Sequence, residues 1–401
     1  MSNDQLLGLY EHSSRLFQLA DRLTLSSPQH ILLKNLQGSS PAFVISAIFR
    51  IQASSQLNHM VVCEDAETAA YFHNSLENLT KALDIFYFPS SFKNNKTYQE
   101  LNSSHVMLRT EALTRWSGGG NKKIIVTYPE ALFEKVVLPE TLAGNMIRLK
   151  TGESIQPEEL MESLVGYGFE RTDFVYEPGQ FAVRGGILDI YSFGNEKPYR
   201  LELFGNEVDS IRIFDPESQL SERRLAQVQI IPNIETHFAK EKKVSLFQFL
   251  PENTVIWLHD HRFIKEKIKI LETELAEFLE SHPSKEMESA EGSVKREISA
   301  EDFIRSSEID GLAGTRHLVE FGPVQKSDAF IIEFHTRPQP AFNRRFERLI
   351  ADLETWESKK FEIYLFAENP KQLERLHTIF EDLKSSIRFT PVASSIHEGF
   401  I

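Results

Sequence analysis

Three stretches of the chain share one pattern of apolar and polar positions. Mostly apolar runs at 60–62, 124–126 and 361–366 are each followed by polar residues and then by apolar residues at helical spacing. A short apolar run is typical of a buried strand, and apolar residues three and four apart are typical of an amphipathic helix. Strand–turn–helix units in series predict a parallel sheet with helices on its faces. We expect two such α/β regions, one within 1–140 and one that starts near residue 330.

Two of these stretches also carry helix-start signals. Thr127 follows the second apolar run and is expected to cap a helix, with Pro129 in its first turn. Asn369 is expected to cap the helix after the third run, and Pro370 follows it. Thr and Asn side chains accept hydrogen bonds from free helix amides, and proline is tolerated at the first helical position.

Between the two α/β regions, residues 171–215 have a different pattern. Turn-forming sequences, EPGQ and FGNE twice, separate short runs with alternating apolar and polar positions. The alternation is clearest in 200–204 and 210–214, where four apolar residues fall on one side of the strands: Leu201, Leu203, Ile211 and Ile213. This pattern predicts an antiparallel meander in a separate small α+β domain.

Composition narrows the class of protein. A chain of 401 residues is too long for one ordinary core, so about two to four domains are expected. The formal net charge of −14 argues against strong unaided binding to nucleic acid. The single cysteine, Cys63, excludes an internal disulfide. No apolar run approaches the length of roughly 20 residues needed to cross a bilayer, and the N-terminal sequence has no signal-peptide pattern. We therefore expect a cytoplasmic location without membrane contact.

A search for catalytic motifs finds no active-site constellation. The pattern G-x-x-x-x-G-K-[ST], which would cradle phosphates, does not occur. His259 and His261 alternate in HDHR, but we interpret the pair as incidental and predict no metal site. Cys63 and the aromatic run 86–88 are interpreted as core. A chain of this size without catalytic residues is expected to be a binding part of a larger system.

Residues 177–219 carry a specific resemblance. The stretch EPGQFAVRGGILDIYSFGNEKPYRLELFGNEVDSIRIFDPESQ resembles the signature segment of bacterial transcription-repair coupling factors (Mfd), and the same module occurs in the excision-repair protein UvrB. The matching positions are Glu177, Gly179, Phe181, Arg184, Gly185, Gly186, Asp189, Pro198, Arg200, Glu202, Phe204, Glu207, Ser210, Arg212, Phe214, Asp215, Ser218 and Gln219. Weaker agreement in the order of elements extends over nearly the whole chain.

The resemblance also implies a degenerate nucleotide site. UvrB needs a complete phosphate loop near its N-terminus, and the equivalent stretch here, 36–46, is LQGSSPAFVIS. It lacks the lysine and hydroxyl that hold the triphosphate and Mg²⁺. The degenerate site comprises Gly38, Ser39, Ser40, Pro41 and Ala42. We therefore expect no cofactor in this chain; ATP and Mg²⁺ would belong to a motor domain that these residues do not contain.

The resemblance implies a protein partner for the small domain. Arg171, Arg184 and Phe181 are expected to lie on a face that binds the damage-recognition protein UvrA. Pro178 and Ala182 stand where UvrB-like sequences carry further arginines. The alternative for Arg184 is a solvated charge at a strand edge. The glycines beside it are expected to relax the backbone where a strand begins or bulges.

Together these observations predict a multidomain α/β protein. The fold would be a Rossmann-like parallel-sheet domain with a degenerate phosphate loop, interrupted by a small α+β domain and followed by part of a second α/β domain. The expected ranges are 1–144 and 217–325 for the two parts of the first domain, 145–216 for the insertion, and 326–401 for the last domain.

The implied function is a non-catalytic N-terminal module that recruits UvrA to RNA polymerase stalled at DNA damage. The full-length protein would be an ATP-dependent DNA translocase that contacts RNA polymerase and double-stranded DNA through other domains. The alternative is a stand-alone nucleotide-binding or DNA-binding α/β protein related to UvrB.

Overall fold

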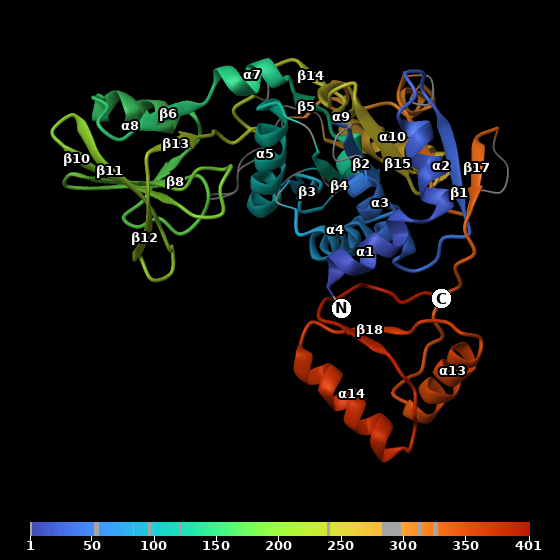
Figure 1. The fold of residues 1–401 in the computed structure, drawn as a ribbon. Helices are drawn as coiled ribbons and strands as arrows, with labels where there is room; N and C mark the ends of the chain where they lie inside the picture. Colours follow the sequence, from blue (N-terminus) through green and yellow to red (C-terminus); the bar gives the residue numbers. More distant parts are fainter. Residues whose placement is uncertain are drawn as a thin grey trace.

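The computed structural model describes most of the chain. The described ranges are 2–51, 56–82, 84–94, 98, 100–120, 122–238, 241–282, 298–311, 315–323 and 328–401. Figure 1 shows a main α/β domain from which a small β-rich domain and a C-terminal unit project in two different directions. Within the described ranges, no helix combines the length and apolarity required to cross a membrane.

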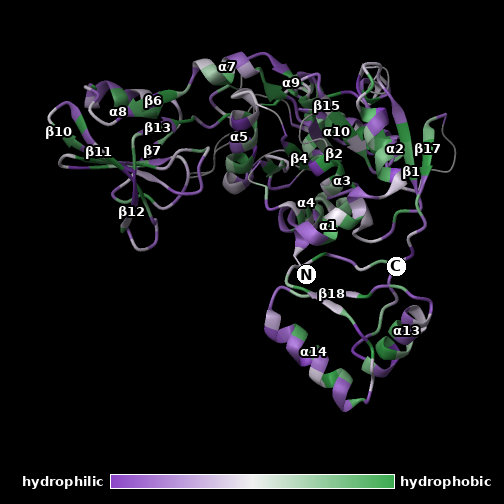
Figure 2. Cartoon of the chain, in the orientation of Figure 1, coloured by the Kyte–Doolittle hydropathy of each residue, from purple (hydrophilic) through white to green (hydrophobic). Residues whose placement is uncertain are grey.

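The main domain is built on a seven-stranded sheet with the order β17-β1-β16-β15-β2-β4-β3. All of its pairings are parallel. The strands are β1 (His30–Lys34), β2 (Asn58–Val62), β3 (Ile85–Tyr87), β4 (Ile124–Thr127), β15 (Thr254–Leu258), β16 (Leu318–Glu320) and β17 (Phe330–Glu333). Their side chains are mostly buried on both faces, as expected for a parallel sheet covered by helices. Figure 2 shows the corresponding concentration of hydrophobic residues in this domain.

The sheet combines two distant parts of the chain. Strand β15 pairs with β2, so that Trp257 lies opposite Val61, and β16 pairs with β1. Residues that precede and follow the small domain therefore share one sheet and one core. Strand β17 also pairs with β1, which places 330–333 in this sheet and extends it beyond the expected boundary at residue 325.

Helices surround this sheet (Figure 1). The main-domain helices include α1 (Asn3–Glu11), α2 (Ser14–Leu23), α3 (Ser40–Ile51), α4 (Ala66–Thr80), α5 (Ser103–Ser117), α6 (Pro129–Phe133), α7 (Pro139–Gly144), α9 (Leu246–Phe249), α10 (His261–Ser281) and α11 (Ser307–Asp310). The expected cap at Thr127 is wrong, because Tyr128 precedes α6 and the Thr127 hydroxyl donates to the Phe88 carbonyl instead, at 2.9 Å. Cys63 is buried, and desolvation raises the pKa of its thiol.

The small domain contains a six-stranded sheet with the order β12-β11-β10-β9-β8-β7. Its strands are β7 (Glu170–Arg171), β8 (Gln180–Arg184), β9 (Ile187–Ile190), β10 (Tyr199–Phe204), β11 (Glu207–Phe214) and β12 (Ser221–Leu225). The strands from β8 to β12 pair antiparallel, which confirms the predicted meander. Helix α8 (Pro157–Gly166) and the antiparallel pair β6 (Ile147–Lys150) and β13 (Gln227–Ile230) complete the domain. Because β12 belongs to the sheet, the domain extends beyond the expected boundary at residue 216.

A buried ion cluster lies where the chain returns from the small domain to the main domain. The Arg109 side chain on α5 is 0% exposed and donates to Glu235 at 2.9 Å, with Glu134 at 3.5 Å from its other end. Burial alone would lower the pKa of the guanidinium, but the two carboxylates outweigh that effect and raise it. Glu134 also accepts hydrogen bonds from Ser90 and Ser91. The cluster therefore connects α5, the segment after α6 and the segment that contains Glu235. The connection is made by charged side chains that are almost completely buried.

The C-terminal unit consists of two strand–helix pairs. It contains α13 (Phe346–Ser358), β18 (Tyr364–Phe366), α14 (Pro370–Asp382) and β19 (Thr390–Val392). Strands β18 and β19 pair in parallel. Asn369 caps α14 as predicted and accepts a hydrogen bond from the Lys371 amide. The structure therefore places a second, smaller α/β arrangement after the main sheet.

Candidate functional site

The loop predicted as a degenerate nucleotide site, which we call the degenerate nucleotide loop, connects a strand to a helix as a phosphate loop would. It leaves β1 after Lys34 and enters α3 at Ser40, with Gly38 in the left-handed region at φ 54°. The Ser40 hydroxyl accepts a hydrogen bond from the Gln37 amide at 2.9 Å. The Ser39 amide donates to the Glu398 carbonyl at 3.2 Å. These loop amides are therefore engaged within the chain.

The cavity beside this loop is unsuited to phosphate. It has a volume of about 470 Å³ and is lined by Glu64 and Glu398, whereas no lysine or arginine is found among its described lining residues. His259 lies in the same wall with Nδ1 3.8 Å from the Glu64 carboxylate, and His261 faces the Ile309 carbonyl from the start of α10. An anion placed here would meet negative charge without a compensating cation.

We predict that the chain binds no nucleotide at this loop. Isothermal titration of ATP with Mg²⁺ into the protein should give no heat beyond dilution, because the loop lacks the lysine and hydroxyl that hold phosphate and metal. Micromolar affinity would contradict the prediction. A titration of Mg²⁺ alone serves as the control for metal binding by the exposed carboxylates.

The small sheet has two chemically different faces. Successive residues of a strand point to opposite faces, so the register assigns each side chain to one of them. One face, termed the inner face, joins the main hydrophobic core through Phe181, Leu188, Ile190, Leu201 and Ile211. The opposite face, termed the outer face, carries Ala182, Arg184, Asp189, Arg200, Glu202, Ser210, Arg212 and Arg224. These charged and polar side chains thus lie on the outer face of the sheet.

The predicted partner-binding residues do not share one surface. Phe181 is on the inner face and 1% exposed, so it cannot contact a partner in the folded domain, and its role is to pack β8 against the core. Arg171 is exposed on the edge strand β7, opposite Phe181 in register. Arg184 lies three residues further along β8 and therefore on the outer face. The expectation that these residues form a single face is corrected by the strand register.

Arg184 is held in place by its neighbours. Its guanidinium contacts the Asp189 carboxylate, donates to the Asp173 carbonyl at 2.9 Å, and lies over the Phe174 ring at 4.7 Å. Asp189 is fully buried and also accepts two hydrogen bonds from Arg200, at 2.7 and 2.8 Å. The side chain of Arg184 nevertheless remains 32% exposed. It is therefore an oriented charge at the surface, which differs from the freely solvated charge of the alternative interpretation.

An arginine row extends this charge across the outer face. Asp189, Arg200, Arg212 and Arg224 are direct neighbours in register on β9, β10, β11 and β12. Arg212 approaches Glu202 at 3.2 Å and is partly exposed, whereas Arg224 is exposed. We define the arginine row as Arg184, Arg200, Arg212 and Arg224. Arg224 does not stand out in the sequence, and the other three positions are not connected there, because their proximity depends on pairing between strands.

The two glycines next to Arg184 have separate roles. Gly185 adopts φ 60° in the turn between β8 and β9, and a Cβ atom there would meet only open space. A Cβ atom on Gly186 would lie 2.7 Å from the Leu203 carbonyl oxygen of β10. The first glycine thus allows the left-handed turn and the second allows the close approach of β10, as the sequence predicted.

Comparisons with known proteins agree with the geometry. Residues 147–238 match the family model described as the UvrB interaction domain, which covers the small domain and its return segment. The transcription-repair-coupling factor of Bacillus subtilis is 32% identical over 247 residues, covering 59% of this chain and 20% of that protein. The corresponding factor of Staphylococcus epidermidis is 22% identical over 432 residues, covering 92% of this chain and 35% of that protein.

A third relative, the transcription-repair-coupling factor of Escherichia coli, is 25% identical over 215 residues and covers 52% of this chain. The chain spans between 18% and 35% of the length of these three relatives. Residues 147–238 therefore match the UvrB interaction domain, within a chain that is similar to part of the transcription-repair-coupling factors.

Proposed function

We propose that this chain is a recruitment module of a transcription-repair coupling factor and that its small domain binds UvrA. The observation that carries the proposal is the arginine row on the outer face of a UvrB interaction domain. The module would act without catalysis and would bring UvrA to RNA polymerase stalled at DNA damage. Translocation on double-stranded DNA, ATP hydrolysis and contact with RNA polymerase would belong to other domains of a full-length coupling factor.

The chemistry of the outer face favours an acidic protein surface as the partner. Arginine guanidinium groups form paired hydrogen bonds with carboxylates, which a single point charge cannot do. Arg184 and Arg200 are already oriented by Asp189, so little side-chain entropy would be lost on binding. The protein as a whole carries a formal net charge of −14, so most of its surface would repel an acidic partner. A basic outer face would then direct that partner to the arginine row.

Calorimetric titration of the chain with UvrA tests the proposal. We expect saturable binding that weakens when the ionic strength rises from about 0.05 M to about 0.5 M, because salt screens exposed charge pairs. Arg184→Ala should weaken binding by about 1–2 kcal/mol, and Arg171→Ala should have a smaller effect because Arg171 does not belong to the arginine row. No binding of the unmodified chain at low salt would contradict the proposal.

The DNA-binding alternative is tested in the same preparation. The arginine row offers charge to phosphates as well as to carboxylates, but the surrounding protein is acidic. We expect a labelled duplex to show no retardation at salt concentrations where UvrA binds. Retardation of the duplex together with no UvrA binding would favour the alternative.

A further inference from the structure

A C-terminal segment of the chain is seated on the degenerate nucleotide loop. We call residues 394–401 the strap. Ser39 and Glu398 form two hydrogen bonds, one from the Ser39 amide to the Glu398 carbonyl at 3.2 Å and one from the Glu398 amide to the Ser39 hydroxyl at 3.1 Å. In a nucleotide-binding protein, the amides of such a loop would face phosphate. Here the loop faces the backbone of the strap.

Gly38 makes this close approach possible. A Cβ atom at this position would lie 2.5 Å from the backbone oxygen of Gly399 and 3.3 Å from that of Glu398. Both obstructing atoms belong to the backbone, so they cannot move aside without shifting the strap. Because Gly38 has no side chain, it leaves the space that the backbone of the strap occupies.

The strap is held at both of its ends. At one end, the side-chain amide of Asn3 in α1 donates to the Ser394 hydroxyl at 3.1 Å. At the other end, Arg337 and Ile401 exchange two backbone hydrogen bonds, at 2.7 and 2.8 Å. Between them, the His397 ring stacks on Tyr71 of α4 with their centroids 3.7 Å apart. The strap therefore contacts the main domain at α1, at the degenerate nucleotide loop and at α4.

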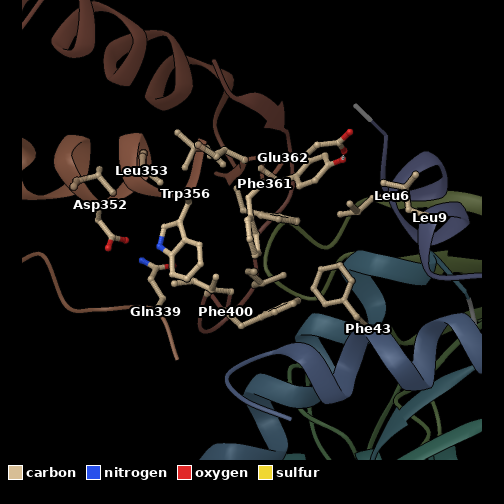
Figure 3. A pocket seen from close by; sticks show the side chains of 18 of the residues that line it. Leu6, Leu9, Phe43, Gln339, Asp352, Leu353, Trp356, Phe361, Glu362 and Phe400 are labelled. Atoms are coloured by element: carbon tan, nitrogen blue, oxygen red, sulfur yellow. Dashed lines mark hydrogen bonds between the residues drawn. The ribbon is translucent and has the colours of Figure 1, made fainter. Parts of the chain in front are cut away.

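The strap also forms a wall of an apolar cavity between the main domain and the C-terminal unit. The cavity has a volume of about 540 Å³ and is lined by Leu6 and Phe43 on one side and by Trp356 and Phe361 on the other. Figure 3 shows Phe400 of the strap beside Phe43, and their ring centroids are 5.4 Å apart in an edge-on arrangement. Displacement of the strap would expose this apolar surface to water.

We infer that the degenerate nucleotide loop is the docking site for the strap, and that this contact fastens the C-terminal unit to the main domain. The strand–turn–helix frame of the loop and the missing side chain of Gly38 leave room for this contact. The occupant is a segment of the same chain, whose Glu398 carbonyl accepts the hydrogen bond that the Ser39 amide would otherwise donate to phosphate. This inference does not depend on binding to UvrA.

Hydrogen–deuterium exchange on the full chain tests the inference, with Gly38→Ala as the variant. The new methyl group collides with Gly399, so amides of Ser39, Arg337 and Ile401 should exchange about tenfold faster. Gly205→Ala is the matched control, because Gly205 has a similar φ of 60° but no atom within 4 Å of its Cβ position. It should leave those three amides unchanged.

A second variant keeps the loop backbone intact. Phe400→Ala removes the contact with Phe43 and should also accelerate exchange at Arg337 and Ile401. Amides of β2, in the centre of the main sheet, should remain protected in every variant. The inference is overturned if Gly38→Ala leaves Arg337 and Ile401 unchanged, if Gly205→Ala accelerates them equally, or if β2 loses protection to the same extent.

Discussion

Replacement of Arg109 by alanine is expected to lower the free energy of unfolding by about 3–5 kcal/mol. The side chain is fully buried between Glu235 and Glu134, so its removal takes the positive charge of the guanidinium away from two buried carboxylates. Its guanidinium also lies over the Phe88 ring at 4.3 Å and donates to the Pro89 carbonyl at 3.0 Å. These packing and hydrogen-bond contacts are lost in the same substitution.

Chemical denaturation of the wild type and the variant measures this effect. Arg115→Ala is the control, because Arg115 lies on the same helix but pairs with Asp84 at the surface, at 3.2 Å with both side chains about half exposed. The control should cost less than about 1 kcal/mol. Equal losses in the two variants would show that the buried cluster has no special role in joining the two parts of the main domain.

Charge reversal of the arginine row is expected to weaken UvrA binding by about 2–4 kcal/mol. The variant is Arg212→Glu combined with Arg224→Glu, because these two side chains are the ones in the row that leave the buried Asp189 untouched. Each substitution replaces an attraction to an acidic partner by a repulsion, which adds to the loss of hydrogen bonds. The fold should persist, since Arg224 is exposed and Arg212 is partly exposed.

Arg223→Glu supplies a matched control for this prediction. Arg223 precedes Arg224 on β12 and is also exposed, but its register partner is Ile213, so it belongs to the opposite face. Calorimetry should show a large loss for the double variant and little change for the control, with similar thermal melts. The double variant changes the net charge by −4 and the control by −2, so a control loss of about half that of the double variant would mean that UvrA responds to net charge alone. Unchanged binding of the double variant would remove the arginine row from the interface.

Local features of this protein follow directly from short stretches of its sequence. The strand–turn–helix units around β2, β4 and α14, the meander of 171–215, and the cap at Asn369 were all predicted, because each depends on neighbouring residues. The roles of Gly185 and Gly186 were also predicted, since a tight turn and a close backbone approach leave few alternatives to glycine. The specific motif of 177–219 indicated a resemblance to the transcription-repair coupling factors, and the match over 147–238 and the similarity to curated coupling factors agree with it.

Features that depend on distant residues were decided by the tertiary structure. Alternation along β8 separates Phe181 from Arg184, but only pairing across strands places Arg200, Arg212 and Arg224 in one row. Likewise, the charge of Arg109 is stabilised by Glu235, 126 positions away, and the nucleotide loop is covered by Glu398, 359 positions beyond Ser39. The spacing of apolar residues indicates which side of a helix or strand is apolar. Which other element packs against that side is determined by the packing of the whole chain.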